Sequence, residues 1–424
     1  MTRDLLAAFF WKGVGIVATF LGTVAVARIL GAREAGWVAL GQSAAKVVST
    51  VALLGVDVAV MRSLSSSIAK GARDRADETL SATYKGSGAL LVAAGVISVA
   101  AAEGAVRFGT LSAKNGEVIV IGVVIALALA TSHLISELLR GSGFISSAVL
   151  FQGGLGPLLT LVCLLAFQRL LDDFGVLWLM ATGEWACAVV AIYWWHRRWG
   201  IRFTPVGPAV VPGLLKAGLV MSLISFFTAF LGWIELFAVS HWTTSTDAAL
   251  LNAAQKVAAI VSLPLLVINI VAAPRYAALN AIGDYAALRS LVLKVMSLSA
   301  LLGLPALAIL AYKGNLVLAI FGKQFIAANS CLRVILVGQL VNLSTGPVIY
   351  LLVMCGRERV ALACVVLAVF VDIAGLSVLV PARGLFGAGI ADSLAVGTMN
   401  LLAAGCAYLY LSRRGNGSAD AALA

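Results

Sequence analysis

Two lysines stand inside long apolar segments, where a charge is costly to hold. Lys46 lies within ALGQSAAKVVSTVALLGVDVAVM at 39–61. Lys256 follows about 210 positions later in ALLNAAQKV, which repeats the earlier ALGQSAAKV. An ammonium group in an apolar helix needs a counter-ion, water or an anionic ligand. The repeat therefore predicts two equivalent buried cations that bind an anion together.

Polar side chains accompany these lysines at helical spacing, so each segment is expected to turn one polar stripe away from lipid. Lys12 adds a third cation in the first apolar segment, and Asn252 corresponds to Gln42 in the repeat. Amides and hydroxyls of this kind suit the recognition of a polar ligand. The candidate substrate-binding residues are Lys12, Gln42, Lys46, Ser49, Thr50, Ser225, Thr228, Glu235, Asn252 and Lys256.

The same residues admit a structural interpretation, which stays open. The lysines could pair with acidic residues of neighbouring helices, for which the candidates are Asp57, Glu184, Glu235, Asp372 and Asp392. Serine and threonine hydroxyls often bond to the preceding helical turn. Glu235 is either a counter-ion for a lysine or a protonatable coupling group. Glu184, Asp372 and Asp392 are expected to brace helices.

The sequence contains no recognisable catalytic motif. No GxxxxGK[ST] motif occurs, and the three histidines have neither metal-ligand spacing nor a neighbouring nucleophile motif. The six cysteines lie singly in apolar segments without paired spacing. We therefore expect no enzyme, no metal site and no bound cofactor, although a proton or a sodium ion could drive a cycle.

Composition identifies the class of protein that must position these residues. Apolar residues make up 61% of the chain and charged residues only 12%, with a mean hydropathy of +1.03. Soluble domains carry about 25% charged residues, so this is an integral membrane protein. The net charge of +11 comes mostly from basic residues between apolar segments. It is therefore assigned to membrane topology, and no nucleic-acid partner is expected.

Twelve transmembrane helices are predicted from apolar windows of about 20 residues. They span about 5–30, 35–61, 86–103, 117–138, 144–168, 174–195, 217–240, 246–271, 290–311, 328–354, 359–380 and 385–411. The Pro-rich, basic stretch near the midpoint separates six spans from six. We expect an N-terminal lobe at 1–196, a cytoplasmic linker at 197–215, a C-terminal lobe at 216–414 and a disordered tail at 415–424.

Orientation follows from the basic residues, which are more numerous on one side of the predicted spans. The positive-inside rule then places both termini in the cytoplasm. Each half has an even number of crossings, so both halves enter the membrane in the same sense. The axis that relates them should run along the membrane normal.

Two segments carry a resemblance to a known family. ARILGAREAGWVALGQSAAKVVSTVALLGVDVAVMRSLS at 27–65 contains an LGxxxxG turn and a Gly-Val-Asp-x-Ala run before Arg62. VNLSTGPVIYLLVMCGRERV at 341–360 contains a Gly-Pro pair and a Gly-Arg turn. These features resemble the polysaccharide-transport flippases of the multidrug/oligosaccharidyl-lipid/polysaccharide exporter superfamily.

The resemblance implies an all-α polytopic fold of two six-helix lobes around a central cavity lined by helices one, two, seven and eight. It implies a flippase that moves polyprenyl-diphosphate-linked oligosaccharide, such as an O-antigen unit for lipopolysaccharide or an exopolysaccharide repeat unit, across the bacterial inner membrane by alternating access. Membrane lipid and glycan polymerases would be its partners. Buried cations suit a diphosphate, and hydroxyls and amides suit sugars.

Two other functions compete with this interpretation. A multidrug or cation antiporter of the same superfamily would need an acidic site within one lobe for the exchanged ion. A membrane glycan polymerase or ligase would need a sizeable external loop with catalytic residues, and no such loop is apparent. The sequence leaves open the glycan, the coupling ion and the oligomeric state.

Overall fold

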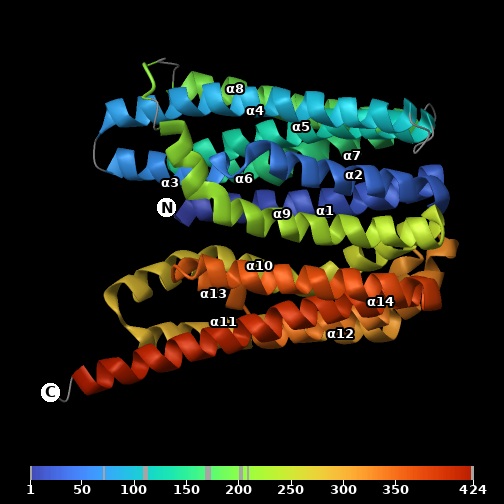
Figure 1. Ribbon diagram of the computed structural model, residues 1–424. Helices are drawn as coiled ribbons and strands as arrows, with labels where there is room; N and C mark the ends of the chain where they lie inside the picture. The colour runs from blue at the N-terminus through green and yellow to red at the C-terminus, as the bar shows by residue number, and fades with distance from the viewer. Residues whose placement is uncertain are drawn as a thin grey trace. The chain divides into compact units, whose positions relative to one another are not determined.

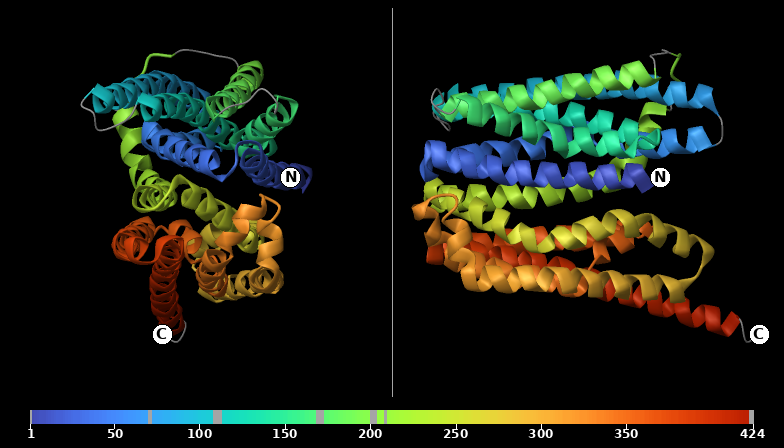
Figure 2. Two further views of the ribbon diagram at one scale, coloured as in Figure 1. Left: turned by 90° about the vertical axis from the view of Figure 1, so that its right-hand side faces the viewer. Right: turned by 180° about the vertical axis from the view of Figure 1, so that it is seen from behind.

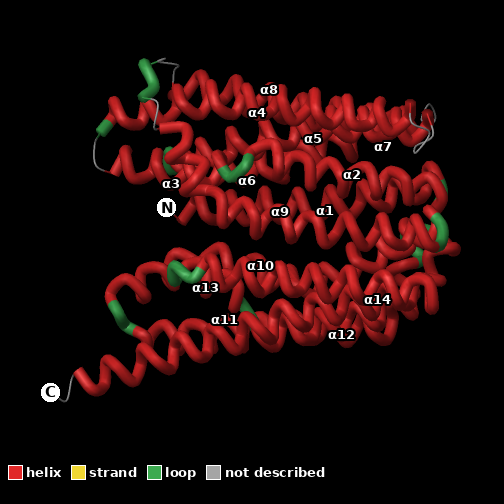
Figure 3. Tube along the Cα trace, viewed as in Figure 1, coloured by secondary structure: helices red, strands yellow, loops and turns green. Residues whose placement is uncertain are grey.

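The computed structural model describes residues 2–69, 72–107, 113–167, 173–199, 204–207 and 210–421. Within these ranges the chain is helical and contains no β-strand (Figure 3), which confirms the all-α prediction. The elements are α1 (Thr2–Leu30), α2 (Ala32–Leu53), α3 (Val56–Ala69), α4 (Arg73–Arg107), α5 (Ala113–Gly141), α6 (Ile145–Val149), the π-helix η1 (Leu150–Gly154), α7 (Leu155–Phe167), α8 (Asp173–Trp199), α9 (Val210–Trp242), α10 (Ser245–Ile282), α11 (Tyr285–Leu318), the 3-10 helix η2 (Lys323–Ala328), α12 (Asn329–Thr345), α13 (Val348–Met354) and α14 (Glu358–Ala421).

The chain forms two compact units (Figure 1). Unit 1 covers Met1–Trp233 and unit 2 covers Ile234–Ala424, so α9 contributes to both. The two-lobe prediction is confirmed at this level. The lobe limits at 196 and 216 stay a prediction, and linker residues 200–203 and 208–209 lie outside the described residues. Helix α14 continues to Ala421 through most of the expected tail.

Ten described helices are long and apolar enough to cross a membrane, and α2 with α3 forms an eleventh span that bends by 51°. The apolar part of α14, Glu358–Ser412, has 55 residues. At about 1.5 Å per residue this is far longer than one crossing of a core about 30 Å thick. If α14 folds back on itself, the structure accounts for all twelve predicted spans.

The backbone of α14 does fold back, at Gly384. This residue has φ 57°, a left-handed conformation that glycine adopts without strain. The two arms then meet so closely that a Cβ at Gly387 would lie 2.0 Å from the carbonyl oxygen of Leu379. Further along, a Cβ at Gly375 would lie 3.1 Å from that of Ala391. Helix α14 is therefore a helical hairpin with two crossings.

Unit 1 is built around α5, which packs against both α2 and α8, while α1 packs on α7 and η1. Apolar positions of α5 face this core, and Leu138 and Leu139 are fully buried. The π-helix interrupts its span at Gly153, whose φ of 178° and ψ of 13° are not helical. This break lets α1 approach, since a Cβ at Gly15 would lie only 1.8 Å from the Gly153 carbonyl oxygen.

Unit 2 pairs α10 with α11 and α12 with α14. In the two views of Figure 2 the yellow α10 and the gold α11 run side by side as a hairpin. Their turn begins at Gly283, with φ 75°, and Asp284 caps α11 by accepting a 2.9 Å hydrogen bond from the Ala287 amide. Pro264 and Pro274 lie inside α10.

Candidate functional site

Unit 2 contains three buried carboxyl groups that lie together. Glu235 of α9 is 5% exposed, and Asp372 and Asp392 of α14 are 0% and 9% exposed. Gln255 of α10 donates a hydrogen bond from Nε2 to Glu235 Oε2. Asp372 and Asp392 both lie within electrostatic range of Glu235. We call these four residues the acidic cluster.

The α14 hairpin brings the two aspartates of this cluster together. Asp372 lies twelve residues before Gly384 and Asp392 lies eight after it, so both stand at similar depths on antiparallel arms. Gly375 and Ala391, which are closer to the bend than the two aspartates, also lie against each other on the two arms. Glu235 then enters from α9, the first helix of this unit.

The acidic cluster is suited to holding protons. Both oxygens of Asp372 and Oδ2 of Asp392 are buried without a hydrogen-bond partner. Three ionised carboxylates could not share such a site without compensating positive charge. No group of three or more His, Cys, Asp or Glu residues in the described part of the chain is arranged to hold a metal ion.

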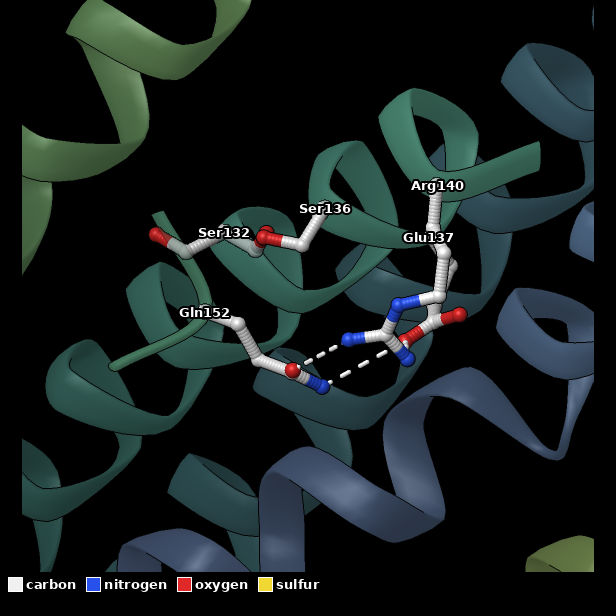
Figure 4. Close-up of polar contacts among 5 residues, drawn as sticks. All are labelled: Ser132, Ser136, Glu137, Arg140 and Gln152. Atoms are coloured by element: carbon white, nitrogen blue, oxygen red, sulfur yellow. Dashed lines mark hydrogen bonds and ion pairs between the residues drawn. The ribbon is translucent and has the colours of Figure 1, made fainter. Parts of the chain in front are cut away.

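Unit 1 contains a mixed network of charges and amides on α5 and η1 (Figure 4). Arg140 donates from Nη1 to Glu137 Oε1 at 2.6 Å and from Nη2 to Gln152 Oε1 at 2.6 Å. The Gln152 amide donates to the same Glu137 oxygen at 3.3 Å. The guanidinium thus joins α5 to the π-helical segment. Glu137 Oε2 is buried without a hydrogen-bond partner.

The lysines of unit 1 lie within electrostatic range of this network. Lys12 interacts with both Arg140 and Lys46, and Lys46 interacts with Glu184 of α8. Gly156 leaves room for this carboxylate, because a Cβ there would lie 2.4 Å from Glu184 Oε2. The side chain of Lys46 itself is exposed. Unit 1 therefore places several cations near acidic side chains, and the ion-pair interpretation of the lysines stays a prediction.

Most of the predicted hydroxyls bond to their own helix. Ser49 and Thr50 donate to the Lys46 carbonyl at 2.8 and 2.9 Å, and Thr228 donates to the Ile224 carbonyl at 2.7 Å. Ser225 is exposed. Gln42 turns its amide to the Met180 sulfur at 2.9 Å. These bonds stabilise helices, and a ligand would have to compete for the same donors.

The remaining predicted residues belong to unit 2. Asn252 and Lys256 are half-buried on α10, and Asn252 lies about one turn before Gln255 while Lys256 directly follows it. Glu235 lies in the acidic cluster, where an amide and two carboxyl groups are its described partners. The pairing of Lys46 with Lys256 around one anion stays a prediction, and so does the set of ten substrate-binding residues.

Sequence reasoning missed the members of both clusters that depend on tertiary contacts. It assigned Asp372 and Asp392 to bracing, and it did not single out Arg140 or Gln152. A signal was present for the aspartates, because Pro381 and Gly384 mark a turn and residues at similar distances from a turn meet. The Glu137 and Arg140 pair has the i, i+3 spacing of a helical ion pair. Gln152 had no such signal.

Comparisons with solved structures identify the fold. The chain superposes on an inward-facing multidrug-resistance MATE family transporter of the MOP superfamily with a TM-score of 0.78, covering 96% of both chains at 14% identity. The fold is that of the MATE transporters. A MOP superfamily transporter from Pyrococcus furiosus, described as having a binding pocket of reverse polarity, matches with a TM-score of 0.71 at 15% identity over 97% of this chain and 96% of that one.

A MATE protein in complex with MaL6 gives a TM-score of 0.69 at 16% identity, covering 98% of this chain and 97% of that one. No protein-family model and no curated protein matches the sequence. Near-complete coverage of both chains means that the whole MATE-like fold is present, not one lobe of it. The chain is a multi-pass membrane protein with a MATE-like fold, and what it does is a separate question.

Proposed function

We propose that this protein is a proton-coupled antiporter in which the acidic cluster of unit 2 binds the exchanged ion. The observation that carries the proposal is the burial of three carboxyl groups close together, with oxygens of Asp372 and Asp392 that have no hydrogen-bond partner. The three carboxyl groups are neutral when protonated and are then compatible with burial. Loss of protons gives them negative charge, which burial disfavours. The protonation of the cluster is therefore coupled to its exposure. An acidic site within one lobe is what an antiporter requires.

Alternating access supplies the coupling. When the cluster is protonated it is neutral and compatible with a dry, closed environment. When it loses protons it needs water or another cation, which favours a conformation that opens it. A substrate that binds only when the cluster is deprotonated would compete with the protons. It would then cross the membrane in the direction opposite to theirs. Amphiphilic small molecules are the substrate class that the MATE-like fold suggests.

Everted membrane vesicles test this proposal directly. Addition of a substrate should dissipate an imposed pH gradient in the wild type and should fail to do so in Glu235→Gln and Asp392→Asn. Glu103→Gln is the matched control, because Glu103 is an exposed acid on α4, 3.9 Å from Arg107. Substrate-driven proton movement that survives in both cluster variants would contradict the proposal.

A second candidate is the lipid-linked oligosaccharide flippase, which would move polyprenyl-diphosphate-linked O-antigen or exopolysaccharide units across the bacterial inner membrane. Lys46, an exposed residue with Lys12 in electrostatic range, favours an anionic head group. Both candidates can share the proton-coupled mechanism. They differ in the substrate.

Surface glycan distinguishes the two candidates. A flippase predicts that Lys46→Ala and Lys256→Ala abolish glycan export while the amount of protein in the membrane is unchanged. Lys313→Ala is the control, since Lys313 is an exposed cation that lies 4.8 Å from the Tyr312 ring. Normal surface glycan in both lysine variants would exclude the cationic site and leave the small-molecule antiporter.

A further inference from the structure

Helix α10 carries polar residues at a constant spacing of seven, which places them on one face. Gln255, Ser262, Asn269 and Tyr276 are two helical turns apart from one another, or about 10 Å per step. We call these four residues the α10 polar column. Asn269 is 4% and Tyr276 0% exposed, so this face is turned into unit 2.

The first two steps of the column are hydrogen-bonded. Gln255 donates to Glu235 of the acidic cluster. Ser262 donates to Gln339 Oε1 of α12, and Asn342 Nδ2 donates to Ser262 Oγ at 3.1 Å and to Gln339 Oε1 at 3.3 Å. Polar contacts of this kind are common as helix-packing contacts in membranes. Such packing explains the first half of the column but not the second.

The last two steps carry buried polar atoms without partners. Asn269 Oδ1 and the Tyr276 hydroxyl have no hydrogen-bond partner. Native proteins rarely leave such atoms unsatisfied, and ordered water is the usual partner. Pro274 adds an acceptor, because a proline inside a helix frees the carbonyl four residues earlier, here that of Ile270. Water is therefore expected along this half of the column.

The column ends at the α10–α11 turn. One turn after Tyr276, Asn280 accepts a 2.6 Å hydrogen bond from the Tyr410 hydroxyl, and the Arg357 guanidinium lies 5.0 Å from the Tyr410 ring. Asn280 and Tyr410 are half-buried, so water can reach this end. The titratable groups at the other end are Glu235, Asp372, Asp392 and Cys331, and Lys256 follows Gln255 in the chain.

We propose that the α10 polar column is the route by which protons reach the acidic cluster from the end of unit 2 at the α10–α11 turn. Water molecules bridge the steps of about 10 Å, roughly three to each gap at hydrogen-bond spacing. At each step one O–H bond breaks as the next one forms: a proton enters from water at the Asn280 and Tyr276 end, passes from water to water, and forms the O–H bond of a neutralised carboxylate of the cluster. Asn269 and the hydroxyls of Tyr276 and Ser262 hold and orient these waters. This inference rests on the proposed role of that cluster.

Infrared spectroscopy of the full-length protein in lipid nanodiscs tests the route without any substrate. After transfer to D₂O, the stretching band of protonated carboxyl groups shifts as they exchange, and Glu235→Gln identifies the band of the cluster. Asn269→Leu and Tyr276→Phe should slow this exchange by about tenfold or more. Asn400→Leu is the control, because Asn400 is a buried asparagine of α14 whose Nδ2 donates to the Val396 carbonyl at 2.9 Å.

The possible results separate the two proposals. A cluster band that exchanges equally fast in wild type, Asn269→Leu and Tyr276→Phe overturns the route and leaves the acidic cluster intact. A wild-type protein with no band removed by Glu235→Gln overturns both. Tyr276→Phe deletes one oxygen from a full-sized ring, so its result stands even if Asn269→Leu fails to fold.

Discussion

Ionisable side chains are buried in both units, but they are compensated in different ways. In unit 1 the Arg140 guanidinium is bound by a carboxylate and an amide from two elements. In unit 2 the Gln255 amide donates a hydrogen bond to Glu235, and in our proposal bound protons neutralise the remaining negative charge of the cluster. The first arrangement has its counter-charge built in, so we expect it to hold structure. The second changes charge with its protons, so we expect it to act in the transport cycle.

Arg140→Met tests the structural role. It would leave Glu137, whose side chain is 6% exposed, without its counter-ion, and the unfolding midpoint in detergent should fall by several degrees, equivalent to roughly 2 kcal/mol. The double variant Arg140→Met with Glu137→Leu should recover most of the loss. Glu103→Gln should have no measurable effect, because the Glu103 and Arg107 side chains are 62% and 81% exposed. Equal midpoints for single and double variants would contradict this role.

At the scale of elements, the packing of unit 1 depends on a close contact between a helix and a π-helical break. Helix α1 reaches η1 because Gly15 has no side chain and Gly153 leaves the helical geometry. In membranes, small residues at such crossings permit the backbone approach that stabilises helix pairs. Gln152 lies in the same break and is held there by Arg140. The break therefore positions both a packing contact and a polar one.

Gly15→Ala should disrupt this contact. Its Cβ would lie 1.8 Å from the Gly153 carbonyl oxygen, which is backbone and cannot rotate away. We expect a loss of roughly 1–3 kcal/mol and a lower yield of folded protein. Gly13→Ala, two residues earlier on the same helix, has nothing within 4 Å of its Cβ and should be neutral or slightly stabilising. Thermal unfolding of the two purified variants makes the comparison, and equal stability would refute the contact.

At the scale of the whole molecule, α14 decides the number of crossings in unit 2. Because Gly384 reverses the chain, the turn before Glu358 and the end of the second arm should lie on the same side of the membrane. The basic residues at both places predict the cytoplasm for that side. The two units themselves match known MATE-like folds over nearly the full chain at 14–16% identity.

Reporter fusions test this topology. A green fluorescent protein fused after Arg357 or after Arg414 should fluoresce, and a phosphatase fused after Arg383 should be active. The outcome follows from two crossings between Arg357 and Arg414, with the hairpin bend outside. Opposite reporter activities at Arg357 and Arg414 would show a single crossing and refute the hairpin.

The sequence alone determined the properties that depend on composition and on local repetition. Apolar windows are set by the thickness of the bilayer, so the twelve spans and the all-α class followed from counting. Lys12, Lys46 and Lys256 were conspicuous because a charge in an apolar window is rare. Their joint binding of an anion stays a prediction, since it depends on the two units together.

Only the tertiary structure decided which buried polar groups meet. Asp372 and Asp392 are separated by a turn, and Glu235 comes from another helix, so no local pattern linked the three. Nothing in the sequence marks Gln152, but in the structure its position on η1 lets it accept a hydrogen bond from Arg140. Helical periodicity fixes the face on which a residue lies, but the packing of helices from distant parts of the chain fixes what that face touches. The sequence resemblance implied a two-lobed fold of this kind, and the structural matches at 14–16% identity confirm it where no family model matches, because packing is retained after sequence similarity is lost.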